Sequence, residues 1–221
     1  MNYFLKLTAA VAIIVQLLLP LTSNCATTKP SLKKNDSPTT LPSLLANYQS
    51  LQANFIQLTT DSTGSSLGEK ITGTLLIQRP GKLKWETFHP HQQLIIINEG
   101  IATTYTKDLA QAIKKKIDLS AKTPASLLLG NANSLRQLFI MDRLPTTAGK
   151  ELFLLKPKDP DADFLWIKTS FQQGVIKNMI IKDKLDQQTI IHFEKIKLNP
   201  VIADKSFIFI PPPDTEVLEN F

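Results

Sequence analysis

Histidine, cysteine and clustered carboxylates are the side chains of this sequence that could support catalysis or bind a metal ion. The segment His89-Pro90-His91 holds two of the three histidines, and Glu86 is the only acid close to it. The proline fixes the backbone between the imidazoles, and a zinc or transition-metal site needs further ligands. We therefore predict solvated loop histidines, and we expect His192, in an alternating segment, at the surface or hydrogen-bonded in the core.

The carboxylates offer no better catalytic or metal-binding pattern. Asp159, Asp161 and Asp163 alternate around Pro160, but they lack the glycine and the terminal glutamate of a calcium-binding loop. The sequence also lacks a glycine-rich phosphate loop and a serine nucleophile elbow. These observations predict neither an enzyme nor a cofactor or metal site.

The first 25 residues have the pattern of a secretory signal peptide. Lys6 precedes an apolar run from Leu7 to Leu21, and small or polar residues follow as far as Ala26. The run is shorter than the roughly 20 residues that a membrane-spanning helix needs, so we expect cleavage and export to the periplasm. Cys25 is the only cysteine, which excludes a disulfide within the chain. Thr22 and Asn24 stand where a bacterial lipidation signal has a leucine-like and a small residue, so ordinary cleavage is favoured over lipidation of Cys25.

Composition and charge are those of an ordinary globular protein. The 221 residues are 43% hydrophobic and 20% charged, with a formal net charge of +6. The densest basic cluster, Lys114-Lys115-Lys116, has no aromatic residues between its lysines, which argues against a nucleic-acid platform. It is typical of a solvated strand or turn, and a weak attraction to anionic surfaces is the functional alternative.

Beyond the signal peptide, the pattern predicts one mainly β domain with a few helices. Residues 26–40 are polar and form a flexible leader before a single domain at 41–221. Apolar residues at helical spacing from Leu41 to Leu51 predict a first helix, and Ala125–Leu129 and Ser134–Phe139 predict two more, with Thr123 as an N-cap and Pro124 in the first turn. Period-two alternation predicts antiparallel strands that begin near Phe55 and continue at Lys70–Gln78, Lys82–Phe88, Gln93–Asn98, Ile101–Thr106, Gln111–Ile117, Glu151–Lys156, Phe164–Phe171, Val175–Asp183, Gln188–Lys197 and Ser206–Ile210.

Several of these strands are apolar on both faces. Leu75-Leu76-Ile77, Leu94 to Ile97, Leu152 to Leu155 and Met179-Ile180-Ile181 lack the clean alternation of a sheet with one solvated face. Either helices cover both faces of the sheet, or one face lines a cavity for an apolar guest. The predicted helices are few and short, which adds weight to a cavity in a strongly curved sheet or open barrel.

A proline-glycine turn connects two of the strands and lies close to an aromatic residue. The segment from Gln78 to Trp85 places Arg79-Pro80-Gly81 between the strands, and Trp85 follows in the second strand. With further residues along nearly the whole mature chain, this segment is similar to the periplasmic lipoprotein-carrier family, LolA. The matching residues are Phe55-Ile56-Gln57, Gly73, Arg79-Pro80-Gly81, Trp85, Pro90, Gly100, Tyr105, Leu109, Gln111, Thr123-Pro124, Leu155-Lys156-Pro157, Met179, Asp183, Phe207, Phe209 and Pro212.

The resemblance implies an unclosed antiparallel β-barrel with a helical lid over an apolar cavity. Such a carrier shields the acyl chains of triacylated lipoproteins in the periplasm. An inner-membrane ABC transporter releases the lipoproteins to it, and an outer-membrane receptor takes them over. The resemblance implies no cofactor, no metal ion, no nucleic acid and no catalysis, and we expect a monomer.

The resemblance also implies roles for individual residues. Arg79 matches the arginine that holds the lid closed through hydrogen bonds to backbone carbonyls. Trp85, Leu75 and Ile77 are expected at the cavity wall, and Pro124 to Leu129 match the lid, with Leu127, Leu128 and Leu129 over the cavity. Leu83 stands at a transporter- or receptor-facing position that is aromatic in well-known members, so this chain departs from the family pattern there.

Two alternatives from other functional classes stay open. An outer-membrane lipoprotein receptor of the same fold requires a lipidated Cys25. A binding module that senses envelope lipids could use the same cavity to regulate a partner, although such regulators usually carry a second domain.

Overall fold

A computed structural model describes residues 39–117, 124–129 and 132–220 of the chain, so the signal peptide, Cys25 and nearly all of the leader lie outside the described residues. The described helices are α1 (Leu41–Ala46), α2 (Pro124–Leu129), α3 (Ala132–Leu138) and the 3₁₀ turns η1 (Lys107–Leu109) and η2 (Asp204–Phe207). None of these helices has both the length and the apolar character needed to cross a bilayer. The strands are β1 (Ser50–Thr60), β2 (Ile71–Gln78), β3 (Lys82–His89), β4 (Gln93–Asn98), β5 (Ile101–Thr106), β6 (Gln111–Lys116), β7 (Phe139–Leu144), β8 (Lys150–Pro157), β9 (Phe164–Gln172), β10 (Val175–Asp183), β11 (Gln188–Leu198) and β12 (Glu216–Asn220).

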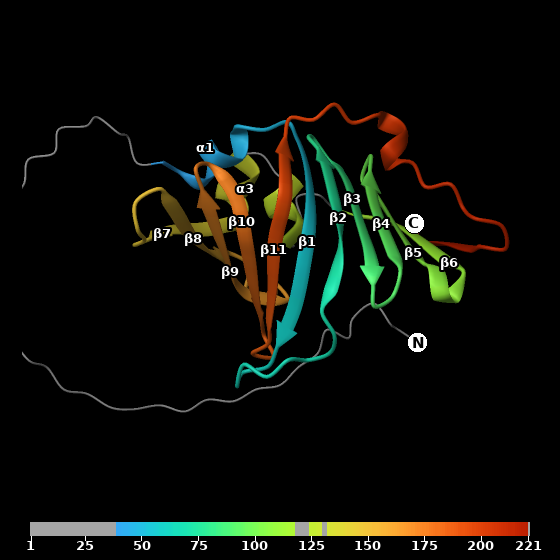
Figure 1. The fold of residues 1–221 in the computed structure, drawn as a ribbon, viewed down its shortest axis with the longest axis horizontal. Coiled ribbons are helices and arrows are strands. Elements are labelled where there is room, and N and C mark those ends of the chain that lie inside the picture. Colours follow the sequence, from blue (N-terminus) through green and yellow to red (C-terminus); the bar gives the residue numbers. More distant parts are fainter. Residues whose placement is uncertain (1–38, 118–123, 130–131, 221) are drawn as a thin grey trace, which may run out of the picture.

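The described strands form one curved sheet that does not close on itself. Its order is β12-β6-β5-β4-β3-β2-β1-β11-β10-β9-β8-β7, so β12 and β7 lie at separate edges (Figure 1). All neighbours are antiparallel except β12, which pairs with β6 in parallel. Short turns produce this order on each side of the central β1–β11 pair, because hairpins place consecutive strands side by side. The predicted mainly β, unclosed architecture is confirmed.

One face of the sheet is apolar and is covered by the helices. Figure 1 shows the helices gathered behind the strands of one half of the sheet. Leucines of all three helices share one buried cluster with alternate residues of the strands, as period-two geometry requires. This cluster includes Leu41, Leu44, Leu45, Tyr48, Phe55, Leu75, Ile77, Leu83, Leu127, Leu128, Leu129, Leu135, Phe139, Phe153, Ile167, Phe171, Met179, Ile191 and Phe193.

The outer face of β3 to β5 is covered by the C-terminal segment with its 3₁₀ turn η2, not by α1, α2 or α3. This segment leaves β11, runs along the ends of the strands and reaches β6 (Figure 1). Its turn η2 contacts β3 and β4, and the ring of Phe209 lies 5.4 Å from that of Tyr105. Ile96 and Phe207 are therefore buried outside the main cluster, at 4% and 1% exposure. The doubly apolar character of β4 thus has a cause that neither sequence interpretation included.

The predicted first helix and the predicted last strand differ most from the structure. The first helix ends at Ala46, since Asn47 caps it and β1 begins at Ser50, so Tyr48 and Leu51 pack against the core from beyond the helix. The segment Ser206–Ile210 is not a strand, because η2 occupies its first residues. Its alternation has another cause: Phe207 faces the sheet, whereas Ile208 is 57% exposed.

Candidate functional site

Arg79 lies at the end of β2, where the chain turns into β3. Its backbone N–H donates to the carbonyl oxygen of Gln49 at 2.8 Å, which ties the turn to the segment between α1 and β1. Gly81 has φ 76°, a left-handed conformation that glycine adopts without a steric penalty. The turn therefore holds the half-buried Arg79 side chain beside both α1 and α2.

The Arg79 guanidinium donates to three oxygen atoms from two helices and their flanking chain. Nε and Nη2 donate to the carbonyl oxygen of Leu128 in α2, at 3.2 and 2.9 Å. Nη1 donates to the carbonyl oxygen of Leu45 in α1, and Nη2 also donates to the Tyr48 hydroxyl at 3.1 Å. One planar group with five N–H donors suits this arrangement, which a lysine ammonium cannot reproduce.

The two carbonyl acceptors are available because each lies in the last turn of a short helix. Carbonyls there have no N–H partner within the helix and carry the negative end of the helix dipole. For Leu45, the N–H that would continue the helix belongs to Gln49, and it donates instead to Asn199 Oδ1 at 2.8 Å. Local helix ends therefore create the acceptors that Arg79 uses.

Tyr48 supports the guanidinium with its ring as well as its hydroxyl. Arg79 Cζ lies 4.3 Å from the centroid of the Tyr48 ring, and Tyr48 is 2% exposed. Burial raises the pKa of Tyr48, against a smaller lowering by Arg79, so the phenol stays neutral. Burial lowers the pKa of Arg79, which as a guanidinium nonetheless remains charged at neutral pH. Within the described residues no carboxylate pairs with Arg79.

The other residues singled out in the sequence lie close to this arrangement but are buried. Leu75 and Ile77 are 0% exposed, and Leu127 to Leu129 are between 0% and 6% exposed. Leu83 is 3% exposed, so it presents no surface to a partner in this conformation. Trp85 is partly buried, and its ring lies 4.1 Å from that of Phe55.

Gly73 explains how the Phe55 and Trp85 rings come together. Gly73 pairs with Phe55 across β1 and β2, and a Cβ atom on Gly73 would lie 2.6 Å from Phe55 Cζ and 2.0 Å from the carbonyl oxygen of Glu86. Only glycine leaves room for the Phe55 ring to lie over the backbone at this point. Trp85 packs against that ring at an interplanar angle of 34°.

The sequence singled out Arg79 and the lid residues, but it did not point to Tyr48 or to α1 as partners of the guanidinium. Tyr48 was interpreted as an ordinary core-facing residue of the first helix. A tyrosine on an apolar face was nevertheless a usable signal, because a buried hydroxyl needs a hydrogen-bond partner. The two carbonyl acceptors left no such signal, since every residue has a carbonyl.

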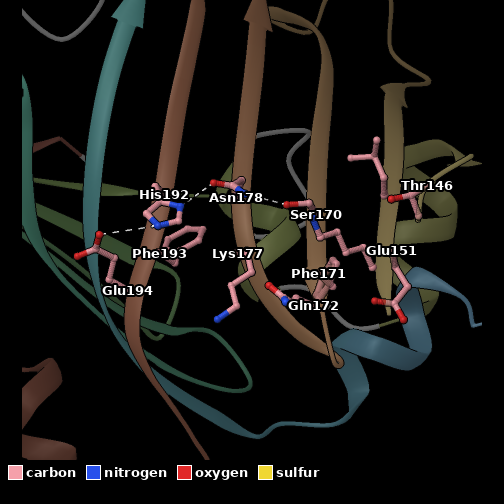
Figure 2. A pocket seen from close by; sticks show the side chains of 12 residues that line it. Thr146, Glu151, Ser170, Phe171, Gln172, Lys177, Asn178, His192, Phe193 and Glu194 are labelled. Carbon is pink, nitrogen blue, oxygen red and sulfur yellow. Dashed lines mark hydrogen bonds and ion pairs between the residues drawn. The ribbon is translucent and has the colours of Figure 1, made fainter. Parts of the chain in front are cut away.

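A groove on the outer face of the sheet lies away from Arg79 and has a different character. Its volume is about 570 Å³, and Figure 2 shows His192, Asn178 and Ser170 in a row across β11, β10 and β9. His192 Nδ1 lies 2.7 Å from Asn178 Oδ1, and Asn178 donates to Ser170 at 3.0 Å. Charged residues also line the groove, so an acyl chain there would remove charges from water without compensation. These charged residues are Lys150, Glu151, Lys177 and Glu194.

The remaining histidines and acids form no centre in the described part of the chain. His91 Nδ1 lies 2.9 Å from Asp108 Oδ2, and both side chains are exposed. Across the described ranges, no group of three His, Cys, Asp or Glu side chains is placed to hold a metal ion.

Comparisons with known proteins identify the family of the chain. The family model described as outer membrane lipoprotein carrier protein LolA matches residues 46–210. An outer-membrane lipoprotein carrier protein from Pseudomonas putida (strain W619) is 36% identical over 182 residues, which cover 81% of this chain and 85% of that protein. One from Coxiella burnetii (strain CbuK_Q154) is 32% identical over 190 residues, covering 85% and 89%.

A solved structure shows the same fold at much lower identity. An uncharacterised conserved protein from Thermus thermophilus has a TM-score of 0.54 at 9% identity, covering 81% of this chain and 97% of that one. The likeness at that identity concerns the fold alone. Taken with the family model and the curated relatives, these findings show that the chain belongs to the LolA family of outer-membrane lipoprotein carrier proteins.

Proposed function

We propose that the protein is a periplasmic carrier that holds the acyl chains of lipoproteins on the concave apolar face of its sheet. It receives them from an inner-membrane ABC transporter and passes them to an outer-membrane receptor. Support comes from the curated relatives, which are named as such carriers at 36% and 32% identity. The observation that carries the mechanism is the set of hydrogen bonds from Arg79 to α1 and α2.

An apolar container is a physical requirement of this function. Each buried methylene contributes about 0.8 kcal/mol, so a chain of about fifteen methylenes contributes roughly 12 kcal/mol. A protein with several such chains does not leave a bilayer on a useful timescale unless the chains enter another apolar environment. The concave face offers that environment, and α2 separates it from water.

In this conformation the concave face is filled by the protein's own side chains. Leu127 is 0% exposed and Leu128 is 2% exposed, so an acyl chain takes their place only when α2 moves away. Leu83, at 3% exposure, likewise has to become uncovered before it can meet the transporter or the receptor. The closed form therefore competes with the cargo for the same apolar surface.

Arg79 sets the balance between the closed and the loaded form. Hydrogen bonds to charged groups contribute about 1.5–3 kcal/mol each, so the two that tie Arg79 to Leu128 of α2 contribute about 3–6 kcal/mol, less than the burial of one acyl chain. Cargo can therefore open the lid during loading. Re-formation of the Arg79 hydrogen bonds favours the closed form again and helps to release the cargo at the receptor.

Release of an inner-membrane-retained lipoprotein from spheroplasts tests the proposal. We expect purified mature protein to move the lipoprotein into a soluble complex when a functional transporter is present. If no soluble complex forms under those conditions, the carrier function is wrong. If labelled fatty acid is incorporated into the mature protein and lost in Cys25→Ser, the outer-membrane receptor becomes the better assignment.

Arg79→Leu tests the latch within the same assay. We expect this variant to load lipoprotein nearly as well as wild type but to deliver it poorly to outer membranes, because the closed form is weakened. Arg136→Leu is the matched control, since Arg136 is an exposed arginine of α3. Equal loading and equal delivery by Arg79→Leu and wild type would contradict the latch.

A further inference from the structure

The sheet ends in two edge strands, β12 and β7, and no strand of the described residues pairs with the far side of either one. At the first edge, β12 of the C-terminal segment is seated on β6 in parallel. At the other edge, β7 pairs with β8, and no strand of the described residues pairs with its far side. An open edge strand presents backbone N–H and C=O groups that can pair with another extended chain.

The register identifies the backbone groups that point to the open edge. Lys158 N–H donates to the Leu138 carbonyl at 2.9 Å, just before β7, which makes Leu138 and Lys158 a hydrogen-bonded pair next to the ladder. Hydrogen-bonded pairs alternate along antiparallel strands. The N–H and C=O groups of Phe139, Met141 and Arg143 therefore point away from β8. Pro157, which has no N–H, stands opposite Phe139, as this alternation requires.

The open edge is continuous with the lid. The chain runs from α2 through residues 130–131 into α3, and β7 begins directly where α3 ends. Phe139, the first residue of β7, is 2% exposed and belongs to the buried cluster on the helix-covered, concave face of the sheet, called the concave cluster below. Arg143, at the other end of the strand, is exposed. The β7 edge thus begins in the concave cluster and ends in solvent. A lipoprotein whose acylated end lies in that cluster must also pass from the cluster to solvent, so its polypeptide can follow the same edge.

We propose that the open edge of β7 pairs, as an added strand, with the extended polypeptide next to the acylated end of a bound lipoprotein. This inference rests on the proposed carrier function. Backbone pairing gives affinity without dependence on side chains, which suits a carrier whose cargoes share a lipid but not a sequence. The exposed charges of Asp142 and Arg143 oppose uncontrolled association of this edge with other edges.

Removal of one outward N–H tests the proposal with little change to the sheet. Arg143→Pro deletes an N–H that points to the open edge, a position where edge strands tolerate proline, and Arg143→Ala is the matched control for the side chain. We expect the proline variant to lose a full-length lipoprotein roughly 2- to 10-fold faster than the alanine variant, as for one net hydrogen bond. Both variants should hold triacylated cysteine, which has no polypeptide, equally well.

Amide hydrogen exchange of the unmodified protein gives a second measurement that does not depend on how the proline variant folds. The amides of Met141 and Arg143 should exchange more slowly with lipoprotein bound than with triacylated cysteine bound. If lipoprotein slows neither amide, or if the two variants release lipoprotein equally, the pairing is wrong. If protection appears without cargo and rises with protein concentration, a second copy occupies the edge and the proposal is overturned. Failure to load any lipoprotein would instead reject the carrier function together with this inference.

Discussion

The Arg79 guanidinium donates its hydrogen bonds to neutral oxygen atoms and not to a carboxylate. This limits how strongly the closed form is stabilised. Removing one partner of a buried ion pair typically costs about 3–5 kcal/mol, since the other charge stays buried without compensation. Arg79 is only half-buried, and its acceptors are two carbonyls and a phenol, all of which water can satisfy after opening. These hydrogen bonds join α1 and α2 without an ion pair, as the proposed opening by cargo requires.

Tyr48 should make the stability of the protein sensitive to alkaline pH. Burial raises its pKa above the ordinary tyrosine value of about 10, so the folded protein holds the phenol proton more tightly than the unfolded chain does. The resulting stabilisation is complete below about pH 10 and is lost as pH rises through the raised pKa. Tyr48→Phe has no phenol proton to lose, so its stability lacks this pH dependence. It also lacks the hydroxyl that accepts from Arg79, which should lower the free energy of unfolding by about 0.5–1.5 kcal/mol at neutral pH.

Urea unfolding of wild type and Tyr48→Phe across the alkaline range checks this prediction. The wild-type advantage in the free energy of unfolding should be present near pH 8 and should shrink above about pH 10. An advantage that stays constant over that range would mean that Tyr48 does not titrate with unfolding.

Gly73→Ala should be among the more damaging small substitutions in the sheet. The new Cβ would overlap a backbone carbonyl of β3 as well as the Phe55 ring, so we expect a loss of about 3 kcal/mol in the free energy of unfolding. Gly64→Ala separates steric overlap from backbone preference, because nothing lies within 4 Å of its Cβ but its φ is +86°. We expect the control to cost about 1–2 kcal/mol. A Gly73→Ala variant no less stable than Gly64→Ala would contradict the close packing.

At the scale of elements, turn chemistry decides how well the sequence predicts the structure. The strands Gln93–Asn98, Ile101–Thr106 and Val175–Asp183 have the predicted bounds. Glu99-Gly100 and Gln173-Gly174 stand beside them in the left-handed region, so short turns fix where these strands end or begin. Boundaries marked by such turns can be predicted from the sequence alone.

Elements whose conformation depends on distant partners could not be predicted in this way. The strand β12 is mostly polar, and its pairing with β6 provides its extended conformation. The strand β7 follows α3 without a turn signal, so its first residue was included in the predicted helix. Which backbone carbonyls accept from Arg79 could not be predicted for a related reason, since this depends on where the short helices end.

The C-terminal segment should contribute to stability through one face of its alternating residues. Phe207 is 1% exposed against the sheet, so Phe207→Ala should lower the free energy of unfolding by about 3–5 kcal/mol. Ile208→Ala is the matched control, because Ile208 is 57% exposed and its truncation should change stability by less than about 0.5 kcal/mol. Denaturant unfolding measures both values, and equal effects would show that the segment does not pack as a cover for the outer face.

At the scale of the whole molecule, the segments that cover the two faces of the sheet are attached to it in different ways. The outer face of β3 to β5 is covered by a segment anchored at both ends, by Asn199 N–H to the Ser50 carbonyl at 2.8 Å and by the β12–β6 pairing. The concave face is covered by short helices joined through Arg79. Under the proposed carrier function, acyl chains enter the concave face after the Arg79 hydrogen bonds and the packing of the helix leucines have been broken.

An apolar ligand without any protein part should therefore report on the lid alone. If the binding-competent open form is a minor population, the apparent affinity for a fluorescent fatty acid is reduced by that population. Arg79→Leu enlarges the open population, and a loss of about 1.4 kcal/mol from the closed form raises the apparent affinity about tenfold. Arg136→Leu should bind the fatty acid as wild type does, because Arg136 lies on the exposed side of α3. If Arg79→Leu and Arg136→Leu bind equally, Arg79 does not control access, and the closed state depends on packing of the helix leucines instead.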